Sequence, residues 1–209
     1  EQALHEFEYA RRCDPSIAQI SLNIGRMQIA LERQELAVDA LELAIKQDPN
    51  LVEAWYTLGN ARRSLHQTGA SIAAYQQALN LNPQHIDTLI NLGNAYKDQG
   101  RITEALDLFR EALRIDPNNF AASENLLSSL VGRWAEADSA AALNFARQMP
   151  RPAERRSLTA TVLDVWAGTN NAAALAFAQT LPAGPEREIR FTCGMGMYRG
   201  SVRAVSEGR

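Results

Sequence analysis

The sequence predicts an all-α solenoid built from stacked helical hairpins. The first observation behind this prediction is a 34-residue period in the prolines, which stand at Pro15, Pro49, Pro83 and Pro117. Other small residues keep the same period, namely Gly25, Gly59, Gly93, Ala10, Ala44, Ala78 and Ala112. A period of this length is typical of helical repeats that bury their apolar faces against neighbouring repeats.

Each period is predicted to hold two helices, as residues 86–119 illustrate. The apolar residues that share one face of the first helix are Leu89, Leu92, Gly93 and Tyr96. Those that share one face of the second helix are Ala105, Phe109 and Ala112. The small residues allow the two backbones to approach closely. Pro117 then ends the second helix, because it lacks a backbone donor and restricts the residue before it.

This phased set of residues resembles the tetratricopeptide repeat, although Leu89 stands where the family often has Trp. The stretch from Ala54 to Ala61, with Tyr75, Ala78 and Pro83 behind it, is similar. The resemblance implies a right-handed superhelix over residues 1–132, such as the arrays of O-linked N-acetylglucosamine transferase-like proteins. Its expected parts are a half repeat at 1–17, repeats at 18–51, 52–85 and 86–119, and a partial repeat at 120–132.

The copies depart from the family pattern at several positions. Ser21 and Gln28 replace large core residues of the first full copy. In the second copy, Arg62 stands for a usual Tyr, Ser71 for a usual Ala, and Gly69 is predicted in a later turn position. Residues 1–17 contain only the second helix of a hairpin. We therefore expect an upstream helix to cover its apolar face.

The resemblance also implies a concave groove in residues 18–132, lined mainly by the first helix of each repeat. Carried over copy by copy, the predicted groove residues are Asn23, Arg26, Glu53, Tyr56, Asn60, Arg63, Asp87, Asn91, Asn94, Lys97 and Asn125. One repeat position reads Asn23, Thr57, Asn91 and Asn125, similar to the asparagine ladder of those transferases. Amides can bind the backbone of an extended peptide because each offers a donor and an acceptor. The alternative is that they serve packing or solubility alone.

The predicted function is a non-catalytic protein–protein interaction scaffold that binds an extended or helical segment of a protein partner. One alternative is a docking or regulatory segment of a larger glycosyltransferase or other enzyme. A second is self-assembly into a homo-oligomer through the incomplete N-terminal repeat. Clamping of acidic chaperone tails is disfavoured, because the family positions that need cations hold Tyr56, Ala121 and Asn125 here.

Composition and motifs bear on other function classes. The net charge of −3 and the mixed charges of the groove do not predict a nucleic-acid partner. His5, His66 and His85 fall in different repeats without metal spacing, and no catalytic motif stands out, so no enzyme, cofactor or metal site is predicted. Cys13 and Cys193 are interpreted as buried free thiols. No apolar run is long enough for a membrane span, so a soluble protein is expected. The compartment stays open, with the cytoplasm preferred.

The second half follows a different period. A partial fourth hairpin is predicted to gather Ser123, Leu126, Leu127 and Leu130 on one face. Residues 133–209 then show a 32-residue spacing, with Trp134, Leu143, Phe145 and Pro150 matched by Trp166, Leu175, Phe177 and Pro182. This region resembles the Trp/Ala-Leu/Leu-Pro helical-hairpin repeats of bacterial proteins. Its last segment, 191–209, is expected to be helical to about residue 205 only if it stacks on the preceding hairpin.

Overall fold

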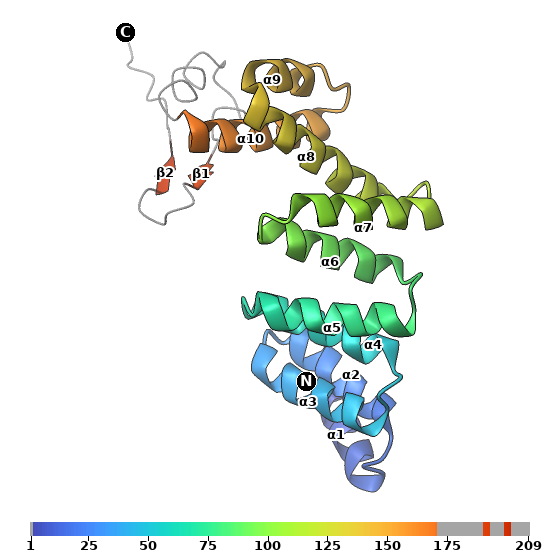
Figure 1. Cartoon of the computed structure of the whole chain (residues 1–209). Coiled ribbons are helices and arrows are strands. Elements are labelled where there is room, and N and C mark those ends of the chain that lie inside the picture. The colour runs from blue at the N-terminus through green and yellow to red at the C-terminus, as the bar shows by residue number, and fades with distance from the viewer. Residues whose placement is uncertain (1, 171–189, 193–198, 202–209) are drawn as a thin grey trace. The chain divides into compact units, whose positions relative to one another are not determined.

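A computed structural model describes residues 2–170, 190–192 and 199–201 of the 209-residue chain. The chain divides into two compact units, residues 1–125 and 126–209, which we describe in turn. Apart from one short strand pair, the regular structure of the described residues is helical, so the all-α prediction is confirmed (Figure 1). None of the helices between residues 2 and 170 combines the length and apolar character that crossing a membrane requires.

The first unit is a series of antiparallel hairpins. Its helices are α1 (Gln2–Cys13), α2 (Ala18–Ala30), α3 (Gln34–Gln47), α4 (Val52–Ser64), α5 (Thr68–Leu81), α6 (Ile86–Asp98), α7 (Ile102–Ile115) and the beginning of α8 (Phe120–Ala137). The pairs α2–α3, α4–α5 and α6–α7 form the three predicted hairpins, and each helix from α1 to α6 also packs on the next one along the chain.

Each hairpin closes on the same contact between a glycine and a large side chain. Gly25 lies against Leu41, Gly59 against Tyr75 and Gly93 against Phe109. These three large side chains are fully buried. A Cβ atom on Gly93 would stand 2.5 Å from Cε1 of Phe109, which is closer than carbon atoms pack. The regular spacing of these glycines therefore reflects the same close contact between two helices, repeated in each of the three hairpins.

Within each hairpin, the first helix ends in a left-handed residue. These residues are Glu32, His66 and Gly100, with φ angles of 59°, 58° and 74°. The backbone N–H of the following residue bonds back to the helix, as from Gln67 to the carbonyl of Arg62 at 2.9 Å. This is the Schellman arrangement, in which glycine is favoured because it has no Cβ.

The placement predicted for Gly69 is wrong. Gly69 lies in the first turn of α5 rather than in the turn between the helices, and a Cβ there would meet nothing within 4 Å. The left-handed position of this hairpin belongs to His66, three residues earlier. The second copy thus has Gly69 inside a helix, where a residue of higher helix propensity would be more stable. It has His66 at the left-handed position, where glycine would be more stable.

Replacing His66 with glycine is expected to stabilise the first unit by about 0.5–1 kcal/mol. The left-handed conformation costs a residue with a Cβ about 1–2 kcal/mol, and glycine removes this strain. Glycine also has greater freedom in the unfolded chain, which lowers the net stabilisation by about 0.5–1 kcal/mol. Urea denaturation followed by circular dichroism measures the change. Gly100→Ala should shift stability by a similar amount in the opposite direction, and equal midpoints for all three proteins would refute the assignment.

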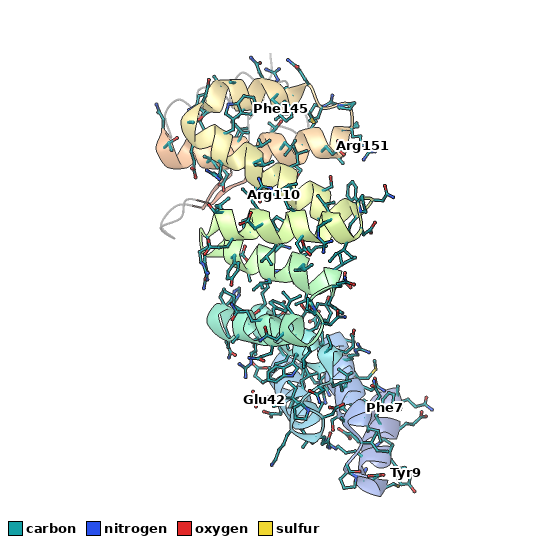
Figure 2. All side chains as sticks on the ribbon, turned by 45° about the vertical axis from the view of Figure 1, so that its right-hand side comes forward. Phe7, Tyr9, Glu42, Arg110, Phe145 and Arg151 are labelled. Atoms are coloured by element: carbon teal, nitrogen blue, oxygen red, sulfur yellow. The ribbon has the colours of Figure 1, made fainter. Side chains whose placement is uncertain are left out.

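Two departures from the repeat pattern have visible consequences. Ser21 and Gln28 are buried, and their side-chain oxygens have no hydrogen-bond partner among the described residues. Arg62, in place of the usual Tyr, pairs with Glu42 of α3 at 2.5 Å (Glu42 is labelled in Figure 2). A long cationic side chain is therefore accommodated by reaching a carboxylate on the preceding hairpin.

Helix α1 is less covered than the other second helices. Its residues equivalent to the buried Ala105, Phe109 and Ala112 are Ala3, Phe7 and Ala10, and all three are partly or fully exposed. Tyr9, labelled with Phe7 in Figure 2, is 64% exposed. Cys13 is exposed as well, so the prediction of a buried thiol is wrong at this position, while Cys193 lies outside the described residues. The reason is that, among the described helices, α1 packs mainly on α2.

The second unit contains the rest of α8, α9 (Ser139–Arg147) and α10 (Pro152–Thr169). Asp138 caps α9 by accepting the backbone N–H of Ala141, and the helix stops before Met149 and Pro150, as predicted. The residues that fill the core are Val131, Ala135, Ala142, Leu143, Ala146, Leu158, Val162 and Leu163. The second copy of the 32-residue period falls largely on residues 171–189, outside the described part.

One prediction for this unit is wrong, and the condition attached to another is not met. Leu130, expected on the buried face of a fourth hairpin, is 42% exposed, because α8 turns Val131 and Ala135 toward α9 and α10 instead. Near the end of the chain, β1 (Arg190–Thr192) pairs antiparallel with β2 (Arg199–Ser201), with Phe191 opposite Gly200. Helix to about residue 205 was expected only if this segment stacked on the preceding hairpin, and these six residues are not helical. The several glycines of this stretch disfavour a helix.

Candidate functional site

All eleven predicted groove residues lie on first helices of the first unit, and we call this set the first-helix surface. Helix α2 carries Asn23 and Arg26, α4 carries Glu53, Tyr56, Asn60 and Arg63, α6 carries Asp87, Asn91, Asn94 and Lys97, and α8 carries Asn125. None of them is fully buried, since nine are half-buried and Arg26 and Asp87 are exposed. Their polar groups are therefore within reach of a partner.

Two of the predicted amides are hydrogen-bonded to each other across neighbouring repeats. Nδ2 of Asn91 donates to Oδ1 of Asn60 at 2.9 Å, and it also approaches the hydroxyl of Tyr56 at 3.4 Å. Oδ1 of Asn60 accepts a second hydrogen bond, at 2.7 Å, from the hydroxyl of Tyr75. Both lone pairs of this oxygen are therefore used within the protein.

These bonds determine which amide atoms face outward. Because Oδ1 of Asn60 is held by Asn91 and Tyr75, its Nδ2 group is left as a donor; because Nδ2 of Asn91 is held, its Oδ1 is left as an acceptor. Neither of these two remaining atoms has a partner among the described residues. The pair thus presents one donor from α4 beside one acceptor from α6, which matches the alternating carbonyl and N–H groups of an extended chain.

Tyr75 of α5 supports this pair and was missed as a site residue, because its position predicts only a core contact. Its ring is fully buried against Gly59 while its hydroxyl reaches Asn60. Burial raises the pKa of the Tyr75 hydroxyl to about 12, so the group is a neutral donor at physiological pH. The Asn60 carbonyl therefore stays oriented toward the core.

His85, which the sequence places outside any metal site, lies beside the first-helix surface. It is the N-cap of α6, where Nδ1 accepts from the backbone N–H of Thr88 at 3.3 Å. Its Nε2 lies 3.2 Å from Glu53, and its ring lies 5.1 Å from that of Tyr56 between centroids. Glu53 in turn pairs with Arg26 at 2.7 Å. A chain of contacts thus links α2, α4 and the start of α6.

Near the end of α6, one cation is paired with a carboxylate and another is not. Arg63 of α4 pairs with Asp98 at 2.9 Å. Lys97, beside it, is half-buried and donates to Oδ1 of Asn125 at 3.5 Å. Burial lowers the pKa of the Lys97 ammonium, since desolvation disfavours the charged form.

A continuous amide ladder does not form. Thr57, which occupies the ladder position between Asn23 and Asn91, is buried, and its hydroxyl donates to the carbonyl of Glu53 in its own helix at 2.6 Å. Asn23 accepts from Gln19 one turn earlier at 3.4 Å. The cooperating amides are therefore Asn60 and Asn91, which come from different repeat positions.

Sequence models of one family match much of the first unit. Two models described as tetratricopeptide repeat match residues 1–51 and 86–119, and one described as TPR repeat matches residues 59–100. No curated protein matches the sequence.

Several solved structures are similar to the chain in fold. The crystal structure of MamA has a TM-score of 0.59 and 20% identity, with 81% of this chain and 90% of that chain covered. The first TPR of Spaghetti (RPAP3), bound to an HSP90 peptide, has a TM-score of 0.53 and 19% identity, with 54% and 90% covered. The first TPR domain of human RPAP3 has a TM-score of 0.53 and 20% identity, with 56% and 91% covered. Identities this low show the fold alone.

Proposed function

Since the chain belongs to the tetratricopeptide repeat family and is a protein-interaction scaffold, we propose that its first-helix surface binds an extended segment of a partner protein. The observation that carries the proposal is the Asn60–Asn91 pair, whose internal hydrogen bonds leave one donor and one acceptor for a peptide backbone. Holding both amides in place before binding lowers the conformational entropy lost on association.

The charges of this surface favour backbone recognition over capture of an acidic tail. Arg26 and Arg63 are both occupied by carboxylates: Arg26 pairs with Glu53 of the same surface, and Arg63 pairs with Asp98 at the end of α6. The positions at which the family places cations for chaperone tails hold Tyr56, Ala121 and Asn125. The likeness to an RPAP3 domain with an HSP90 peptide therefore does not extend to a proposal that this chain binds the same tail.

Asn60→Asp tests the proposal without removing the internal contacts. An aspartate keeps the oxygen that Tyr75 and Asn91 bond, but replaces the outward donor with a second oxygen, which repels a peptide carbonyl. We expect peptides selected from a displayed random library against the whole chain to bind this variant about tenfold more weakly by fluorescence anisotropy, as expected for loss of a hydrogen bond plus repulsion. The midpoint of urea denaturation should change little.

Asn80→Asp is the matched control, because it makes the same chemical change on an exposed position of α5 outside the first-helix surface. It should leave affinity as in the unaltered chain. Equal affinities for all three proteins, or a library selection that yields no binding peptide, would contradict the proposal.

A further inference from the structure

Lys97 stands apart from the other cations of the first-helix surface, because no carboxylate of the described residues lies within ion-pair distance of it. Asp98, the next residue, is held by Arg63 at 2.9 Å. Glu124 acts on Lys97 only at longer range. Within the described part of the chain, Nζ of Lys97 donates one hydrogen bond, to Oδ1 of Asn125, and this bond is long, at 3.5 Å.

The ammonium of Lys97 therefore carries a cost of burial that the more distant charges of Asp98 and Glu124 offset only in part. The side chain is half-buried, and its pKa is lowered mainly by desolvation. A carboxylate brought by a partner would supply the missing counter-charge in a place that is partly shielded from water, where such a pair is stronger than on an open surface. Asn94, one turn earlier on α6, is half-buried beside it and offers an amide donor to the same carboxylate.

We propose that Lys97, assisted by Asn94, binds the side-chain carboxylate of a single aspartate or glutamate in the partner segment. The proposal rests on the proposed function, because it concerns the same segment that contacts Asn60 and Asn91. The Lys97 site requires a particular side chain, whereas Asn60 and Asn91 bind only the peptide backbone. It therefore determines which extended segments bind.

The spacing along α6 sets where that acidic residue falls. Asn91, Asn94 and Lys97 follow one another at intervals of three residues, which forms a ridge on the helix. Six residues of α-helix rise about 9 Å. An extended peptide covers about 3.3 Å per residue. The acidic residue should therefore lie about two or three positions from the residue whose backbone meets the amide pair.

The charge of the first unit restricts the segment further. Residues 1–125 contain 11 Lys and Arg against 17 Asp and Glu, a net charge of −6. At long range this field repels a strongly acidic segment, while Lys97 attracts a carboxylate only nearby. A neutral or basic segment with one acidic residue avoids the long-range repulsion and still brings a carboxylate to Lys97. A run of acidic residues would be repelled.

The experiment uses peptides selected from a displayed random library on the whole chain, then synthesised with amidated C-termini. We expect them to share one Asp or Glu at a fixed position. Lys97→Gln should weaken their binding about tenfold, as should replacement of the peptide's acid by its amide. The two changes together should cost little more than either alone, which is the signature of a direct pair. Lys46→Gln, at an exposed lysine of α3, is the matched control and should have no effect.

The outcomes separate this inference from the proposed function. Peptides that are weakened by Asn60→Asp but bind Lys97→Gln normally would overturn the carboxylate site and leave backbone recognition standing. Peptides that bind only with a free C-terminal carboxylate would overturn the side-chain assignment. A selection that yields no peptide would overturn both. Because the charge of Lys97 is disfavoured by burial, Lys97→Gln should fold normally, and a urea midpoint equal to that of the unaltered chain verifies it.

Discussion

Gly93→Ala is expected to lower the free energy of unfolding of the first unit by about 2 kcal/mol, the middle of the range for overpacking a buried contact. The new Cβ would stand 2.5 Å from Cε1 and 2.9 Å from Cζ of Phe109, whose ring is fully buried and cannot withdraw without moving α7 from α6. The loss is expected despite the higher intrinsic helix propensity of alanine. Urea denaturation followed by circular dichroism measures it.

Gly69→Ala is the matched control, since it makes the same substitution inside a helix where the new Cβ meets nothing within 4 Å. Here only helix propensity changes, so the variant should be more stable by about 0.5–1 kcal/mol. The two substitutions should therefore have opposite signs. A similar gain in both would show that the close contact between Gly93 and Phe109 does not exist.

The free energy of unfolding of the first unit is expected to fall at alkaline pH, because Tyr75 then loses its proton. Its pKa is about 12 in the folded chain because the hydroxyl is buried, against 10 for an exposed tyrosine. The folded state thus holds the proton more tightly than the unfolded state, and the resulting stabilisation is complete below pH 10 and lost as the pH rises toward 12. The loss should amount to about 2 kcal/mol over this interval, at 1.36 kcal/mol per pKa unit less some solvent screening.

Tyr75→Phe isolates this effect from the other groups that titrate in alkali. At pH 7 the variant should be less stable by about 1 kcal/mol, because Asn60 loses a hydrogen bond. Between pH 10 and 12 the unaltered chain should lose stability faster than the variant, so that the two curves converge and cross. Parallel curves over the whole range would contradict the raised pKa.

The hairpins could be predicted from sequence because their packing recurs. The same close approach is made by Gly25, Gly59 and Gly93, so one physical constraint leaves three traces at a fixed spacing. The structural role of a residue that departs from the pattern is harder to predict from sequence. Gly69 looked like a displaced turn residue, but the left-handed position belongs to His66, since a backbone conformation depends on its place relative to the helix end and not on which residue is the nearest glycine.

The candidate site could be predicted only as a set of positions. Their places on first helices follow from the repeat, but their partners do not. Asn60 bonds Asn91 and not an amide at its own repeat position, while Thr57 turns its hydroxyl to its own helix. Tyr75 and His85 carried no signal of their own, because a core aromatic and a helix cap are both ordinary features of a repeat.

The period, the hairpins and the helices that carry the polar surface follow from the order of residues, because the spacing of apolar residues reflects how one helix packs on the next. Three properties appear only in the packed fold: which amide atoms face outward, which charges neutralise one another, and that Lys97 lacks a carboxylate within ion-pair distance among the described residues. Those properties depend on distances of about 3 Å between side chains of different repeats. A pattern along one chain does not specify distances of that kind.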